Sequence, residues 1–208
     1  RAGFEQKLRA YVENGGVLVG TYHTGIVGEN DLCYLGGWPG GGLMEVFGVW
    51  NEAIDGLWDG ETNSICVEGL RYEARELCAL IHTRGAKTLG VYGEDFYKGE
   101  PALTVNSFGK GKAYYLAASA EDGFYRDFYG RLVKETGAKR ALNTQLPEGV
   151  EACLREDGDR KFVFLQNFSG EEQAVCIPAG WESFESGKAV EKAVLPPYGS
   201  TVLRGSTK

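Results

Sequence analysis

The segment from His23 to Gly42 is the feature that most constrains how this chain can fold, because it is long, rich in glycine and follows neither a helical nor a strand period. Loops of this length inside compact domains are usually functional or lie at interfaces. The segment directly follows the apolar, β-branched run 16–22, which predicts a strand covered on both faces. Before that run, apolar residues on one face predict a helix over 3–14. A helix that leads into a buried strand favours an α/β sheet.

Further helical and strand patterns continue this α/β part of the chain. A short helix is predicted over 43–47, and a longer one begins with a capping box at 119–122 and ends at Gly137. Between these helices, the pattern of apolar residues predicts strands at 64–67, 77–82, 88–92, 102–107 and 112–117. The glycines of 109–111 predict a hairpin turn between the last two of these strands.

The character of the sequence changes after residue 142, where helical patterns stop. Short strands then recur between turn residues, at 150–154, 161–166, 173–177, 189–195 and 201–204. This spacing predicts a small antiparallel β domain. We therefore predict two domains, an α/β domain over residues 1–142 and an antiparallel all-β domain over residues 143–208.

Charge and cysteine content exclude several classes of protein. The chain has 22 Lys and Arg against 29 Asp and Glu, a net charge of −7, which disfavours nucleic-acid binding. Its apolar runs are far shorter than the ~20 residues of a membrane span. Its 5 widely spaced cysteines are typical of free thiols in a reducing compartment, here the cytoplasm. Because the chain begins with Arg1 inside a helical pattern, we expect it to be part of a longer protein.

Few residues have the spacing that catalysis or metal binding requires. The two histidines, His23 and His82, are not at metal-ligand spacing with a cysteine or carboxylate, and no Cys or Ser stands in a nucleophile elbow. His23 follows the predicted buried strand, at the end where α/β proteins place their sites. One hypothesis is therefore an autonomous enzyme in which His23 acts with Glu29 or Asp31. A structural histidine and solvated turn carboxylates explain the same residues.

Four motifs together resemble a known family. They are Thr24–Asp31 (TGIVGEND), Leu35–Gly40 (LGGWPG), Tyr92–Ala102 (YGEDFYKGEPA) and Phe108–Tyr115 (FGKGKAYY). Because these motifs occur in this order, the chain resembles the C-terminal half of the glycoside hydrolase family 42 β-galactosidases. The resemblance covers nearly the whole chain. The resemblance implies a middle domain with a glutamine-amidotransferase-like (flavodoxin-like) α/β sheet and flanking helices, followed by a small β domain. The (β/α)8 barrel with its two catalytic glutamates would lie outside this chain.

The resemblance also implies a function and a set of partners. The parent enzyme is expected to hydrolyse terminal β-D-galactosides with retention and without a cofactor or metal, and this chain alone is expected to be inactive. The middle domain is expected to form a homotrimer, while the galactoside binds in the barrel. We expect the following loop residues to lie at a subunit interface or pocket wall: His23, Glu29, Asn30, Asp31, Tyr34 and Trp38. Tyr34 and Trp38 look like exposed aromatics, which suit an interface core.

The β domain allows one further hypothesis, a carbohydrate-binding module in which Trp181, Phe184 or Tyr198 stacks on a sugar. Packing in a hydrophobic core explains the same aromatic residues with fewer assumptions. The sugar-binding module and the autonomous enzyme both remain beside the assembly function as hypotheses.

Overall fold

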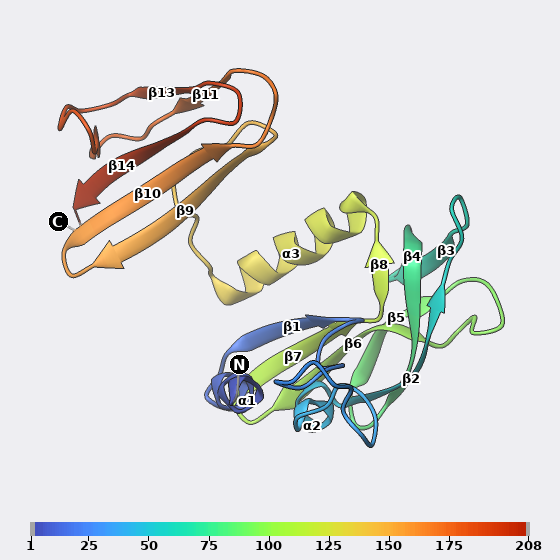
Figure 1. Cartoon of the computed structure of the whole chain (residues 1–208). Helices are drawn as coiled ribbons and strands as arrows, with labels where there is room; N and C mark the ends of the chain where they lie inside the picture. The colour runs from blue at the N-terminus through green and yellow to red at the C-terminus, as the bar shows by residue number, and fades with distance from the viewer. Residues whose placement is uncertain (1–2, 207–208) are drawn as a thin grey trace. The chain divides into compact units, whose positions relative to one another are not determined.

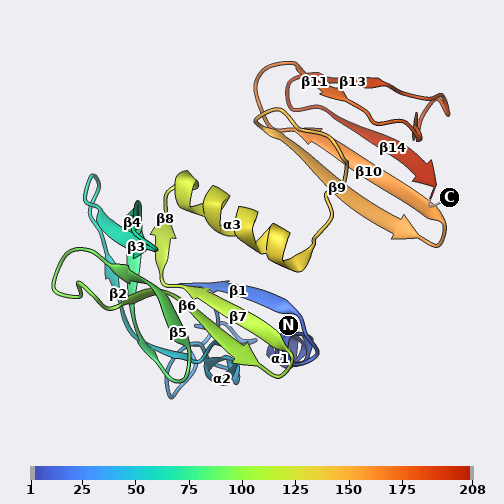
Figure 2. The same cartoon turned by 180° about the vertical axis from the view of Figure 1, so that it is seen from behind.

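A computed structural model describes residues 3–206 of the chain (Figures 1 and 2). The chain divides into two compact units, Arg1–Thr136 and Gly137–Lys208, and each is described by itself. Leu142 packs in the core of the second unit. The domain boundary after residue 142 stays a prediction. No helix in the described part is long and apolar enough to cross a membrane.

The first unit is built on an eight-stranded sheet with a few helices. The helices are α1 (Phe4–Glu13), α2 (Leu43–Phe47) and α3 (Asp122–Thr136). The strands are β1 (Val17–Thr21), β2 (Val49–Gly56), β3 (Asn63–Val67), β4 (Leu70–Thr83), β5 (Lys87–Tyr92), β6 (Pro101–Phe108), β7 (Gly111–Leu116) and β8 (Ala118–Ala120). Their order in the sheet is β1-β7-β6-β5-β3-β4-β2, and β8 pairs with β4.

Helices cover both faces of this sheet, with α3 on one face and α1 and α2 on the other (Figure 1). Successive residues of β7 point to these two faces, as the pleat of a strand requires. The ring of Tyr114 packs edge-on against Phe128 of α3, with ring centres 5.6 Å apart. The next ring, Tyr115, packs edge-on against Phe47 of α2 at 5.3 Å.

The predicted α/β class, a sheet with flanking helices followed by a small antiparallel β unit, is confirmed, with two corrections to the details. The sheet is mixed, because β1 and β7 are parallel whereas the other pairs are antiparallel, and the amidotransferase-like label is not confirmed. The run 16–22 forms β1, but the expectation that it is covered on both faces is wrong. β1 lies at the edge of the described sheet, where only Gly20 is buried and its other residues are half-buried.

A close contact between β1 and α2 fixes how the helix lies on the sheet. Gly20 faces the ring of Phe47, and a Cβ atom built on Gly20 would lie 2.5 Å from Cζ of that ring. Real side chains do not tolerate that distance, so a residue without a side chain is required there. Phe47 and its neighbour Val46 are fully buried.

A buried tyrosine joins strands in the middle of the sheet. The hydroxyl of Tyr92, at the end of β5, lies 3.0 Å from the carbonyl oxygen of Ala79 and 2.9 Å from that of Ala117, and its single proton is shared between these two acceptors. Burial raises the pKa of Tyr92 well above its usual value, so the hydroxyl keeps its proton. The neighbouring Tyr97 donates to Oδ2 of Asp55 at 2.9 Å.

The second unit is an antiparallel β domain. Its strands are β9 (Val150–Asp157), β10 (Arg160–Asn167), β11 (Gln173–Cys176), β12 (Trp181–Ser183), β13 (Lys192–Leu195) and β14 (Ser200–Ser206). A four-stranded sheet has the order β12-β14-β10-β9, and β11 pairs with β13. Val163 and Leu165 of β10 and Leu203 of β14 point into the core, while Phe162 and Phe164 alternate with them. The five predicted strands are found here, and β12 was not predicted.

We predict that Gly20→Ala destabilises the first unit by about 1–3 kcal/mol, because the new methyl group overlaps Phe47. Gly130→Ala is the matched control, since Gly130 lies within α3 with no atom within 4 Å of a built Cβ. Alanine there is expected to stabilise the helix by about 0.5–1 kcal/mol. Urea unfolding followed by circular dichroism measures both changes, and equal effects of the two substitutions would contradict the packing described for β1 and α2.

Candidate functional site

The glycine-rich segment is an ordered loop between β1 and α2. Backbone hydrogen bonds join the amide of Tyr34 to the carbonyl of Ile26 and the amide of Gly28 to the carbonyl of Leu32, both at 2.9 Å. An isolated bridge between Val27 and Cys33 completes this narrow turn-back of the chain. The loop tip, defined as residues 27–35, is therefore held by its own backbone.

Two residues tie this loop to the rest of the unit, Tyr34 by its side chain and Trp38 by its backbone. The hydroxyl of Tyr34 donates to Oε1 of Glu5 in α1 at 2.6 Å. This hydrogen bond holds the pKa of Glu5 below its usual value and raises that of Tyr34. The carbonyl of Trp38 accepts from the amide of Asn51 in β2 at 2.8 Å. Tyr34 and Trp38 are half-buried, so the expectation that they stand out as exposed aromatics is wrong.

Aliphatic side chains form the most exposed apolar surface of the loop. The exposed fractions are 44% for Val27, 67% for Leu32 and 99% for Leu35. Sequence reasoning missed these residues because it looked for aromatic side chains. The available signal was two leucines three residues apart in a loop that is otherwise polar and glycine-rich. Exposed apolar groups gathered on one element are typical of interaction surfaces.

The polar residues predicted for this site lie around the loop tip. Glu29, Asn30 and Asp31 are exposed at its turn, and Asp31 has a φ of 59°. His23 is exposed where β1 ends, with its ring edge-on to Tyr22 at 4.8 Å. Within residues 3–206, no hydrogen bond joins His23 to Glu29 or Asp31, so the pair that acid–base chemistry requires is not formed.

The other potential metal ligands and thiols of the chain are characterised by their grouping and burial. In the described part, no three His, Cys, Asp or Glu side chains come together as ligands of a metal would. The five cysteines are free thiols. Cys78 is fully buried, and burial raises its pKa to about 11, so this thiol is protonated and unreactive at neutral pH.

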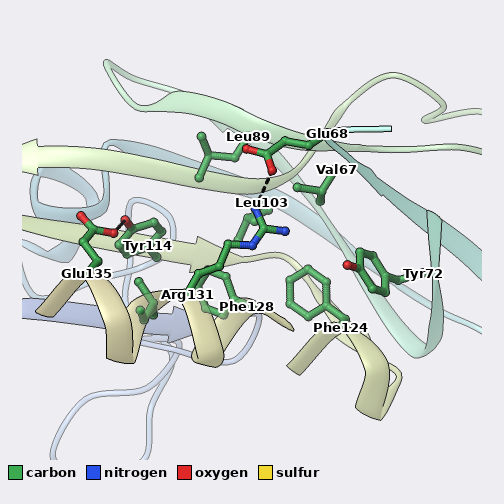
Figure 3. A pocket seen from close by; sticks show the side chains of 11 residues that line it. Val67, Glu68, Tyr72, Leu89, Leu103, Tyr114, Phe124, Phe128, Arg131 and Glu135 are labelled. Carbon is green, nitrogen blue, oxygen red and sulfur yellow. Dashed lines mark hydrogen bonds and ion pairs between the residues drawn. The ribbon is translucent and has the colours of Figure 1, made fainter. Parts of the chain in front are cut away.

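A second surface feature, which the sequence did not predict, lies between α3 and the sheet (Figure 3). We call it the α3 hollow; its volume is ≈ 220 Å³. It is lined by Val67, Glu68, Tyr72, Leu89, Leu103, Tyr114, Phe124, Phe128, Arg131, Leu132 and Glu135. Phe124 and Phe128 stack with ring centres 5.5 Å apart and form the helix side. The hollow thus lies between aromatic rings of the helix and strand residues, and charged side chains are also part of its lining.

Charged side chains surround the mouth of the α3 hollow (Figure 3). Arg131 of α3 donates to Oε2 of Glu68, in the turn after β3, at 2.6 Å. Glu135 accepts hydrogen bonds from Lys112 and from the hydroxyl of Tyr114. The bond from Lys112 is the main cause of a lowered pKa for Glu135. The two carboxylates are therefore paired with cations, and the mouth has no strong net charge of either sign.

The aromatic residues considered for sugar binding lie in different surroundings in the second unit. Trp181 is partly buried and packs against the core. Phe184 is 53% exposed and Tyr198 is 76% exposed, and the ring centre of Phe184 lies 6.0 Å from that of Phe162. Core packing thus accounts for Trp181 but not for Phe184 or Tyr198. The sugar-binding hypothesis stays untested.

Comparison with known proteins identifies both units. The model of the β-galactosidase trimerisation domain matches residues 1–139, and the model of the β-galactosidase C-terminal domain matches residues 149–205. The chain is 46% identical to the β-galactosidase Pbg of Clostridium perfringens and 46% identical to the β-galactosidase BglY of Alicyclobacillus acidocaldarius. Each alignment covers 98% of this chain but 31% of the relative. The chain thus spans about a third of the length of these relatives.

Solved structures give the same result. The β-galactosidase from Rahnella sp. R3 is 44% identical and superposes with a TM-score of 0.78, covering 99% of this chain and 31% of that one. The enzyme from Bacillus circulans sp. alkalophilus is 38% identical, with a TM-score of 0.79 and the same coverage. The matches confirm that the chain corresponds to these two domains and not to the catalytic barrel. The chain therefore belongs to the glycoside hydrolase family 42 β-galactosidases, of which it carries the trimerisation and C-terminal domains.

Proposed function

We propose that this chain is the assembly portion of a β-galactosidase and that its loop tip joins copies of the enzyme into a homotrimer. The observation that carries the proposal is Leu35, which is 99% exposed on a loop tied to α1 and β2. An apolar side chain held in water by an ordered loop gains free energy when a partner covers it. The match to a trimerisation domain supports this use of the loop.

The remaining loop residues have distinct roles in this proposal. Glu29, Asn30 and Asp31 form a polar rim beside the leucines, which is the usual arrangement of an interface. Tyr34 and Trp38 position the loop tip through their bonds to Glu5 and Asn51. We infer that His23, which is exposed where β1 ends, contributes to the wall of a neighbouring substrate pocket.

The parent protein is proposed to hydrolyse terminal β-D-galactosides with retention, in the cytoplasm and without a cofactor. The β-galactosidase relatives, of which this chain spans about a third, support this substrate class. A retaining mechanism needs two carboxyl groups on opposite sides of the glycosidic bond, one as nucleophile and one as acid and base. We assign neither role to a residue of this chain. The chain is proposed to act by holding catalytic domains together.

We predict that the chain has the mass of a trimer in solution and that Leu35→Ser weakens each contact about ten- to hundredfold. The basis is the ~1.5–3 kcal/mol that burial of a leucine side chain contributes. The fold should be unaffected, because Leu35 is 99% exposed. Light scattering over a dilution series measures the effect. Val194→Ser is the control, since Val194 is 52% exposed on β13 of the second unit. A wild-type monomer, or equal effects of both substitutions, would contradict the proposal.

We predict that the hydrogen bond from Tyr34 to Glu5 makes the stability of the loop depend on pH. Because this bond lowers the pKa of Glu5 from 4.5, its contribution is complete above that value and is lost as the pH falls through the lowered pKa. The difference in Tm between the wild type and Glu5→Gln should therefore shrink toward pH ~3. Glu13→Gln in the same helix is the control. A difference that stays constant between pH 3 and 7 would refute the coupling.

A further inference from the structure

A ring of three identical subunits places a constraint on its surfaces. Such a ring is built from heterologous contacts, in which one surface of each copy meets a different surface of the next. The loop tip supplies one projecting apolar surface. A homotrimer therefore requires a second surface of this chain with a complementary shape, and the α3 hollow is a recessed apolar surface on the same unit.

We propose that the α3 hollow of one copy receives the loop tip of the next, with Leu35 and Leu32 entering between α3 and the sheet. This inference rests on the proposed trimeric function, and it names the two surfaces that meet. The partner is thus a second copy of this chain, and the contact is formed by residues of the first unit alone.

The dimensions of the two surfaces agree. An apolar cavity of about 150 Å³ holds a benzene molecule, and a leucine side chain has fewer carbon atoms than benzene. At ≈ 220 Å³, the α3 hollow has room for Leu35 and part of Leu32. Its lining includes the half-buried Leu89 beside the buried Val67 and Leu103, and a leucine packs against these side chains by dispersion and loss of hydration.

The arrangement of the unit prevents one copy from filling its own hollow. The loop is tied to α1 through Tyr34 and runs directly into α2, and both helices lie on one face of the sheet. The hollow lies on the other face, beneath α3 (Figures 1 and 3). A surface that projects on one face and a recess on the other can only meet between copies, head to tail, as a ring requires.

A hydrogen-bond donor at the mouth of the hollow is compatible with the same pairing, although the mouth has no net charge. The segment 23–42 contains two acidic residues, Glu29 and Asp31, and no Lys or Arg. Arg131 stands at the mouth of the hollow and gives one hydrogen bond to Glu68. A guanidinium group has five N–H donors, so Arg131 retains donors for a carboxylate of the incoming loop.

Cysteine cross-linking tests this contact, because the loop tip already carries the exposed thiol of Cys33. A second thiol is introduced at the mouth of the hollow by Arg131→Cys or, separately, by Glu135→Cys. Both positions are exposed, so the fold should tolerate the changes. Diamide then takes up the two hydrogens of a thiol pair as the disulfide forms. The control for position is Arg126→Cys, because Arg126 lies on the outward face of α3. In a second control, Cys33→Ser is combined with each variant to measure cross-linking by other thiols.

The expected result is a covalent ladder of two and three chains with Arg131→Cys or Glu135→Cys, at least about tenfold stronger than with Arg126→Cys and abolished by Cys33→Ser. This expectation follows because a disulfide forms only when the two Cα atoms lie within about 7 Å. A wild-type chain that is a trimer by light scattering but gives no such ladder with either variant overturns this inference and leaves the proposed function standing. A wild-type monomer overturns both. Open-ended ladders beyond three chains would also refute the ring.

Discussion

The approach of Phe47 to Gly20 is the constraint on which the rest of the first unit depends. Because the ring lies directly on the strand backbone, α2 cannot shift along β1 without a clash. The glycine-rich loop starts at the end of β1 and finishes at the start of α2, so both of its ends are fixed by this one contact. The bond from Tyr34 to Glu5 then fixes its middle. A segment with so many glycines is thereby held in one conformation, although its unfolded chain has high conformational entropy.

The fixed conformation of this loop has a direct consequence for assembly. Association loses free energy when flexible segments must be ordered at an interface. In this chain that cost is met during folding of the subunit, because the loop tip is already held by backbone bonds between Ile26 and Tyr34 and between Gly28 and Leu32. The exposed leucines can then contribute their burial fully to subunit contacts. An ordered loop with exposed leucines therefore suits binding of another chain.

The sequence predicted the helices and strands in which apolar residues recur at a regular spacing. Prediction failed where contacts between residues distant in the sequence decide the structure. The helices α1, α2 and α3 follow from their apolar faces, and β6 and β7 follow from the hairpin turn between them. β2 was missed because its polar residues do not alternate, and β12 because it is only three residues long. β8 was missed because 119–122 was expected to cap the following helix; Ser119 instead lies in β8, and α3 begins at Asp122. The pattern of β1 could not reveal that the strand lies at an edge of the sheet. The inward position of Tyr34 depends on Glu5, which is 29 residues away, and the α3 hollow combines several strands with α3. Neither the inward position of Tyr34 nor the α3 hollow can be predicted from a local sequence pattern.

The central claim is that the loop tip is the part of this chain that becomes covered when copies assemble. Hydrogen–deuterium exchange of the wild-type chain, compared between concentrated and dilute samples, tests it most directly. Slower exchange of amides within residues 27–35 in the concentrated sample, with unchanged exchange in the β9–β10 hairpin, is the predicted result. Equal exchange of the loop tip at both concentrations, in samples that differ in mass, would contradict the claim.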